Sequence, residues 1–201
     1  GTAGGGPVDC ENTPVDPVFK FDRKTGAELA NIGKGVMVTP HGIHVDKDGN
    51  VWIADFAGNK AGTKGHQVHK LSPKGEKLLS LGTAGKPGNA DGQFNQPNDV
   101  VTGPDGSIYV SDGHDAQGMT TNAAIAEGLK RGATSRISKF SADGTFIKSW
   151  GKIGVRHGEF RTPHALMFDA KGRLWVADRG NHRLEVFDQE GTYLESRYMY
   201  G

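Results

Sequence analysis

The sequence predicts an all-β protein made of repeated four-stranded units, and three observations support this fold class. A plan of strands and turns recurs three times, beginning at Pro40, Pro97 and Pro163. Glycine fills 31 of the 201 positions, whereas hydrophobic residues make up only 35%. Short apolar segments rich in β-branched and aromatic residues alternate with Gly-containing turns. Repetition of this kind is typical of radial arrays of small sheets, so we expect a β-propeller.

Composition and charge exclude several kinds of partner. Lys and Arg total 24 and Asp and Glu total 23, so no strong field draws the chain toward nucleic acid or an anionic membrane. No apolar run approaches the roughly 20 residues that span a bilayer. The single Cys10 excludes an internal disulfide framework and a thiolate zinc cluster. We therefore expect no nucleic-acid partner and no membrane span.

The chain divides into a tail and a series of blades. Residues 1–16, which open with a glycine-rich stretch, are expected to form a flexible N-terminal tail. A partial blade follows at 17–35, and three near-complete blades are expected at 36–82, 83–152 and 153–201. Together they amount to about three and a half blades.

Each complete blade is predicted to contain four strands joined by hairpins. The first strand follows the fixed proline, and the second reads VWIAD, IYVSD or LWVAD, as a buried strand requires. Glycine in the connecting turns supplies positive φ without steric cost. These turns are Asp48-Gly49, Asp105-Gly106 and Lys171-Gly172 after the first strand, and Lys74-Gly75, Asp143-Gly144 and Glu190-Gly191 after the third. The segment GNHRLEVF (180–187) carries the Asn-His-Leu lettering that names NHL repeats.

Insertions lengthen the repeat beyond the roughly 40–45 residues of a small propeller blade. They lie at 57–65, 84–94 and 114–134. The last contains TNAAIAEGLK, which predicts a short helix with Thr121 or Asn122 as its cap. Because 57–65 and 114–134 both follow a second strand, we expect them to emerge on the same face.

Closure of the ring is expected to require more blades than the three and a half repeats of this sequence. Propellers usually need four to eight blades to bury their sheet faces and edges. Three and a half repeats leave one face uncovered at each end. We therefore expect part of a six-bladed propeller, closed by further blades or by a partner chain.

Equivalent positions of successive blades point at the propeller axis, which makes the residues after the fixed prolines candidates to line the channel. They are His41, Asn98 and His164. Two imidazoles and an amide would suit a divalent metal, with a further ligand from the missing blades. Alternatively, these side chains hydrogen-bond neighbouring backbone at the crowded axis.

A second ring of candidates lies just past the second strands, at Phe56, at Gly113 with His114, and at Arg179. Arg179 offers a planar fork for a carboxylate, or else forms a salt bridge with Asp112 or Asp178. His114 is a candidate general base near neutral pH, or else a solvated loop residue. Three further histidines fall on third strands, and we expect them to be structural: His66, His69 and His182.

These segments resemble the catalytic propeller of peptidyl-α-hydroxyglycine α-amidating lyase and its bacterial NHL relatives. The resemblance runs from Pro17 to about Phe187 and rests on segments whose order and context agree. They are PHG at 40–42, HQVHKLSP at 66–73, FNQPNDVV at 94–101, YVSDG at 109–113, PHAL at 163–166 and VADRGNHR at 176–183. It implies a zinc ion on three histidines, a bound calcium, and cleavage of a peptidyl-α-hydroxyglycine to a peptide amide and glyoxylate.

By this resemblance, His41 and His164 match two zinc ligands and Arg179 matches an arginine that faces the substrate. Ile43 matches a position whose backbone carbonyl binds the structural calcium. His114 stands where the family has its catalytic tyrosine, and the family's third zinc histidine comes from a later blade.

The sequence thus favours a metal-dependent lyase acting on a peptidyl-α-hydroxyglycine or a similar small carboxylate, with Arg179 and His114 as catalytic residues. The alternative is a non-catalytic NHL propeller that presents 114–134 to a protein or a small ligand. A sugar-lactone hydrolase ranks last, because those related propellers use acidic metal ligands in the channel. Bacterial relatives of this kind are usually exported, which favours a periplasmic or secreted location.

Overall fold

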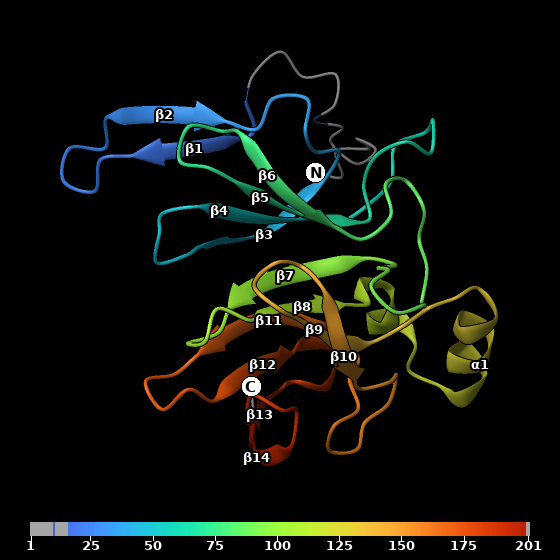
Figure 1. Cartoon of the computed structure of the whole chain (residues 1–201). Coiled ribbons are helices and arrows are strands. Elements are labelled where there is room, and N and C mark those ends of the chain that lie inside the picture. The colour runs from blue at the N-terminus through green and yellow to red at the C-terminus, as the bar shows by residue number, and fades with distance from the viewer. Residues whose placement is uncertain (1–9, 11–15, 200–201) are drawn as a thin grey trace.

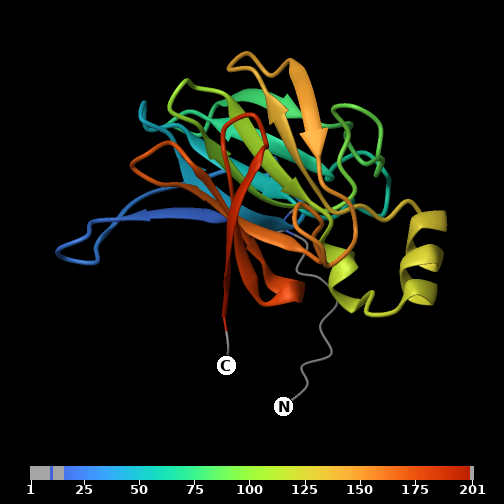
Figure 2. The same cartoon turned by 90° about the horizontal axis from the view of Figure 1, so that it is seen from below.

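The computed structural model describes Cys10 and residues 16–199, and it contains four antiparallel sheets (Figure 1). Apart from Cys10 and Asp16, the predicted tail at 1–16 lies outside the described residues. The first sheet is a hairpin of β1 (Val18–Phe21) and β2 (Glu28–Ile32), which corresponds to the expected partial blade. This hairpin projects from one side of the molecule (Figure 2).

Three four-stranded sheets confirm the predicted complete blades. The first contains β3 (Pro40–Val45), β4 (Val51–Asp55), β5 (Gln67–Leu71) and β6 (Lys77–Leu81). The second contains β7 (Pro97–Thr102), β8 (Ile108–Asp112), β9 (Arg136–Phe140) and β10 (Phe146–Trp150). The third contains β11 (Pro163–Phe168), β12 (Leu174–Asp178), β13 (Arg183–Phe187) and β14 (Tyr193–Tyr198). Each is a meander in sequence order, as the hairpin turns require.

Helices are few among the described residues, and two of the three lie in the longest insertion. The insertion after β8 forms the 3₁₀ helix η1 (His114–Gly118) and then α1 (Asn122–Lys130). Thr121 caps α1 by accepting a hydrogen bond from the Ala124 N–H at 3.1 Å, which confirms one of the two predicted caps. A second 3₁₀ helix, η2 (Arg179–Asn181), follows β12. The insertion at 57–65 emerges on the same side of the molecule as η1 and α1, as expected (Figure 1). None of the helices in the described part of the chain is long and apolar enough to cross a membrane.

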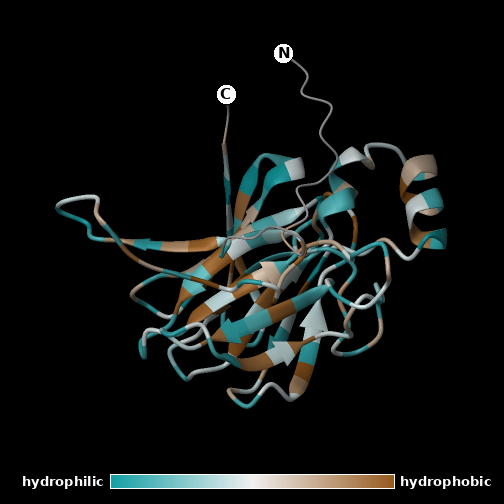
Figure 3. Ribbon diagram, turned by 90° about the horizontal axis from the view of Figure 1, so that it is seen from above, coloured by the Kyte–Doolittle hydropathy of each residue, from teal (hydrophilic) through white to brown (hydrophobic). Residues whose placement is uncertain are grey.

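The core lies between the blades rather than within one. Ile108 and Val110 of β8 pack with Trp52 of the first blade. Tyr109, between them in sequence, points the other way and packs with Leu174 of the third blade. Because its alternating side chains are covered on both faces, β8 is fully buried, from the apolar Ile108 to the polar Ser111 and Asp112. Figure 3 shows most of the hydrophobic residues on the strands, where they alternate with hydrophilic ones.

A buried carboxylate at the end of each second strand fixes the segment that leads into the first strand. Asp55 accepts hydrogen bonds from the N–H groups of Val38 and Thr39. Asp112 does the same for Asn95 and Gln96, and Asp178 for Arg161. The chain is therefore held by a repeated contact just before each fixed proline, which positions the residue that follows it.

Candidate metal and anion site

The first strand of each blade is irregular at the residue after its proline. The pairing register with the second strand shifts between Pro40 and Ile43, between Pro97 and Asp99, and between Pro163 and Ala165. Such bulges re-aim side chains and are frequent beside functional sites. They contain the three residues predicted to face the channel, which are His41, Asn98 and His164.

Asn98 links the two histidine-bearing strands. The Nδ1 atom of His41 lies 2.8 Å from the Asn98 carbonyl oxygen, and a carbonyl can only accept, so Nδ1 carries the proton. The Asn98 side-chain amide in turn donates to the Pro163 carbonyl at 3.0 Å. Asn98 itself is fully buried. It therefore ties the three inner strands together and leaves Nε2 as the ring nitrogen of His41 that is available to a metal.

Three imidazoles meet at this point. The ring of His41 lies 5.0 Å from that of His164 and 5.3 Å from that of His114, centroid to centroid. One potential ligand atom of each histidine lies within 4.8 Å of those of the other two. Among the described residues this is the one group of three or more His, Cys, Asp or Glu side chains spaced to hold a metal ion. The structure thus places His114, which the sequence offered as a general base, beside the two histidines that it offered as metal ligands.

The predicted second ring is built by one repeated backbone hydrogen bond. The N–H groups of Phe56 and Arg179 donate to the carbonyls of Thr39 and Thr162, the residues before two of the fixed prolines. The Phe56 ring stacks on His41 at 5.6 Å and meets the His114 ring edge-on at 4.8 Å. Phe56 consequently forms an apolar wall beside the imidazoles.

Arg179 contacts the histidine cluster and not a carboxylate. Its Nη2 donates to His114 Nε2 at 3.1 Å and to the side-chain oxygen of Gln117. The predicted alternative, a salt bridge with Asp112 or Asp178, is wrong for the described residues. Asp178 instead pairs with Arg183 at 3.0 Å, and Asp112 lies 3.5 Å from Arg136. Arg183 and Arg136 project from the third strands and occupy the space beside these carboxylates. Arg179 is therefore available to the histidine cluster.

Burial and positive charge keep two of the imidazoles neutral. Burial, followed by the charges of Arg179 and His41, lowers the pKa of His114 to about 4. The same causes, with His114 added, lower the pKa of His164 to about 4. Both rings therefore carry a nitrogen lone pair at pH 7, which is the form that coordinates a metal.

Ile43, the residue assigned to calcium, lies next to this cluster on β3. Its side chain is 57% exposed, and it pairs with Ile53 of β4. The calcium role of its backbone carbonyl stays a prediction.

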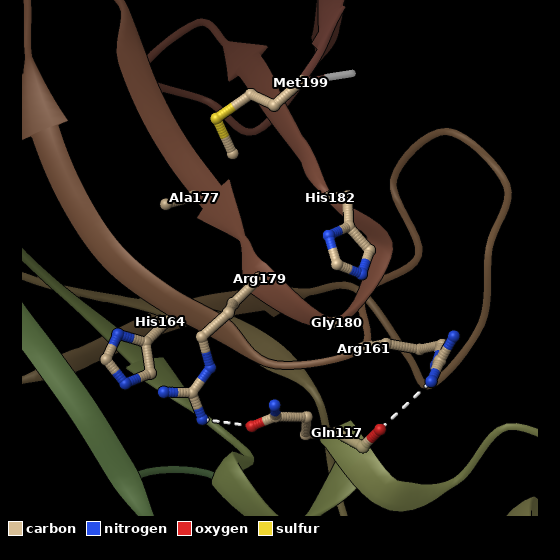
Figure 4. A pocket seen from close by; sticks show the side chains of 8 residues that line it. All are labelled: Gln117, Arg161, His164, Ala177, Arg179, Gly180, His182 and Met199. Carbon is tan, nitrogen blue, oxygen red and sulfur yellow. Dashed lines mark hydrogen bonds between the residues drawn. The ribbon is translucent and has the colours of Figure 1, made fainter. Parts of the chain in front are cut away.

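Two of the three histidines expected to be structural are confirmed as such. His66 contacts the Asn95 carbonyl and the Gly58 N–H, and His69 lies buried against Ser80. His182 differs, because it lines a cavity of about 390 Å³ together with His164 and Arg179 (Figure 4).

The same cavity contains residues that the sequence did not single out, notably Gln117 and Arg161. For Arg161 a signal existed. Arg161 lies two residues before Pro163, which is the position that Val38 has before Pro40 in the first blade. Of these two equivalent residues, only Arg161 is charged. Gln117 lies in an insertion with no repeat equivalent, so the sequence carried no comparable signal for it.

Comparison with known proteins agrees with this architecture. The NHL repeat family matches residues 160–187. The chain is 36% identical over 186 residues to peptidyl-glycine alpha-amidating monooxygenase A of Xenopus laevis, covering 89% of this chain and 17% of that protein. It is 31% identical over 163 residues to a probable peptidyl-alpha-hydroxyglycine alpha-amidating lyase of Caenorhabditis elegans, covering 79% and 39%. It is 35% identical over 162 residues to human NHL repeat-containing protein 3, covering 78% and 41%.

The solved structures that match share the fold at low identity. A gluconolactonase from Xanthomonas campestris aligns with a TM-score of 0.53 at 20% identity, covering 88% of this chain and 53% of that one. The chain is thus an NHL-repeat domain homologous to the amidating proteins, and it spans well under half of their length and about half of a solved propeller chain.

Proposed function

We propose that this chain forms the metal-binding part of a lyase-type propeller that acts on a peptidyl-α-hydroxyglycine or a similar small carboxylate. The observation that carries the proposal is the meeting of His41, His114 and His164 beside Arg179. The homology to amidating monooxygenases and lyases supports the same chemistry.

The donor set fits zinc. Catalytic zinc sites commonly use three protein ligands and keep one position for water or substrate. The hydrogen bond from His41 Nδ1 to the Asn98 carbonyl is the kind of outer contact that fixes the tautomer of a metal-binding histidine. We assign His41, His114 and His164 as the ligands, so His114 supplies the third nitrogen that the family takes from a later blade, and its Nε2 exchanges the hydrogen bond from Arg179 for the metal.

The remaining residues would orient the substrate. Arg179 keeps its charge at any physiological pH, and its fork suits the carboxylate of the substrate. Phe56 would shield the cluster from water on one side. A bound zinc would polarise the substrate hydroxyl and lower its pKa.

Metal content measured on matched variants tests the proposal. We expect elemental mass spectrometry of the zinc-equilibrated protein to give close to one zinc per chain, and His41→Ala, His164→Ala and His114→Ala each to lose most of it. His157→Ala, which removes a histidine of the loop between β10 and β11 that stacks on Tyr193, is the control and should keep its zinc. A wild-type protein without metal would overturn the proposal.

The same variants separate two roles for His114. If His114 acts as a base, as its position in the sequence suggested, His114→Ala keeps the zinc and loses turnover of a hydroxyglycine peptide. If it is a ligand, zinc and turnover fall together. Calcium counted in the same samples tests the proposed role of the Ile43 carbonyl.

A non-catalytic binding propeller is the second candidate. The insertion at 114–134 builds a folded unit in which Met119, Ala133 and Ile153 pack with α1 residues, as a recognition loop would. The homologue named only for its NHL repeats is compatible with it. Absence of metal from a folded protein would favour this function.

A further inference from the structure

The cavity beside His164 is lined by basic and polar side chains. It holds about 390 Å³ at the end of β12, where η2 turns toward the insertion that contains η1 (Figure 4). Two arginines, Arg161 and Arg179, and two histidines, His164 and His182, contribute to its wall. No Asp or Glu is among the described residues that line it.

The two arginines are held by one neutral residue. Arg161 donates to the backbone carbonyl of Gln117 at 3.0 Å, and Arg179 donates to its side-chain oxygen. Neither arginine takes part in an ion pair within the described part of the chain, whereas Arg136 and Arg183 both do. Two permanent positive charges are thereby fixed at one cavity without a counter-charge, which is unfavourable until an anion enters.

Both arginines also retain unused donors. The Nε atoms of Arg161 and Arg179 are buried and have no hydrogen-bond partner. A charged donor without an acceptor is destabilising, so an anion that accepts from these guanidinium groups gains affinity. His182 stands at the rim in a left-handed conformation, φ 53°, which its backbone N–H supports by donating to the Arg179 carbonyl at 3.2 Å.

We propose that Arg161 and His182 form a second anion subsite beside Arg179, so that the site takes substrates with two carboxylates. This inference rests on the proposed function for the role of Arg179. One carboxylate lies at Arg179, next to the imidazole cluster, and the second lies at Arg161. The preferred substrates are then short dicarboxylates, such as a hydroxyglycine joined to an acidic residue.

Binding of simple acids tests the subsite without any turnover. The probes are glutarate, with two carboxylates, and butyrate, with one, titrated by calorimetry into the zinc-equilibrated protein and into chelator-treated protein. We expect glutarate to bind about tenfold tighter than butyrate, since one additional charge-assisted contact is worth about that much. Arg161→Gln should remove this preference and leave butyrate binding unchanged.

Two further variants separate a loss of the subsite from a general loss of folding. His182→Gly suits the left-handed backbone and should weaken glutarate binding by a smaller factor. Arg197→Gln, on the exposed outer strand, is the control and should behave as wild type. Equal affinities for the two acids in the wild type, or an Arg161→Gln variant that still prefers glutarate, would overturn the subsite.

These measurements distinguish failure of the subsite from failure of the proposed function. A glutarate preference that depends on Arg161 in a protein without zinc or turnover supports the subsite and contradicts the lyase. Zinc binding and turnover with no effect of Arg161→Gln contradict the subsite alone.

Discussion

At the scale of single residues, the first hairpin turn of the first blade is organised by one carboxylate. Asp46 accepts hydrogen bonds from the N–H groups of Asp48 and Asn50 at 3.0 and 2.9 Å. Its other oxygen accepts from the indole of the buried Trp52 at 3.1 Å. Asp169 and Trp175 repeat this arrangement in the third blade. The turn is thus tied to the core by a charged acceptor.

Asp46 should make stability depend on pH. Burial raises its pKa, but the hydrogen bonds from Asn50, Trp52 and the backbone outweigh this and lower it from 3.8 to about 2. A lowered folded-state pKa stabilises the protein above the unfolded value, and the gain is lost as pH falls through the folded value. We expect Asp46→Asn to lose roughly 1–2 kcal/mol of unfolding free energy at pH 7. The difference from wild type should vanish as pH falls from about 4 toward 2.

Urea unfolding at several pH values measures this. Asp48→Asn, at an exposed position in the same turn, is the matched control and should change stability by less than about 0.5 kcal/mol. A deficit in Asp46→Asn that persisted unchanged to pH 2 would contradict the assignment.

At the scale of elements, the third strand of a blade holds the loop that precedes its first strand. Arg183 of β13 donates to Asp178 and to the carbonyls of Val155, Arg156 and Glu159. Arg136 of β9 holds the equivalent loop through the carbonyls of Asn89 and Gln93. In the first blade the same register position, opposite Asp55, belongs to Gln67. Two of the three blades therefore use a buried arginine as a clamp.

Replacing this arginine should be costly. Arg183→Gln puts into the third blade the residue that the first blade has, and it leaves Asp178 and Glu185 buried without their cation. Removing one partner of a buried pair typically costs about 3–5 kcal/mol. The control is Arg197→Gln, whose pair with Glu195 is exposed and should contribute at most about 1 kcal/mol. Chemical denaturation measures both, and similar losses in the two variants would show that the clamp is not needed.

At the scale of the whole molecule, the middle blade is the best protected. All residues of β8 and β9 are buried, because the first and third blades cover both faces of their sheet. By contrast, no residue of β1 or β2 is buried, and the two strands pair only with each other. Side chains such as Ile43, Val45 and Met167 remain more than half exposed on the inner strands of the outer blades. Stability should therefore decrease outward from the second blade.

Hydrogen exchange measures this gradient. Amides open with free energies that reflect the burial around them, so we expect β8 and β9 to exchange most slowly. The first and third blades should be intermediate, and β1 and β2 fastest. Mass spectrometry of peptic fragments resolves these segments. Equal protection of the β1–β2 hairpin and β8 would show that the sheets unfold as one unit.

The blades could be predicted from the sequence because their determinants are local. Period-two apolar segments and glycines at positive φ define a hairpin wherever they occur, and repetition of the pattern identified three blades and a partial one. Thr121, one of the two predicted caps, likewise indicated locally where α1 begins. The residues after the fixed prolines could also be predicted as site candidates, because repeat symmetry points equivalent residues of successive blades at the propeller axis.

The partners of those residues depended on tertiary structure. Which arginine neutralises Asp178 was decided by the position of the third strand, and the answer was Arg183 rather than Arg179. The place of His114 beside His41 and His164 depends on how η1 leaves β8, and no repeat fixes the path of an insertion. Repeat symmetry therefore determined the scaffold, whereas the site was decided by insertions and packing contacts, because these bring together side chains that are distant in sequence.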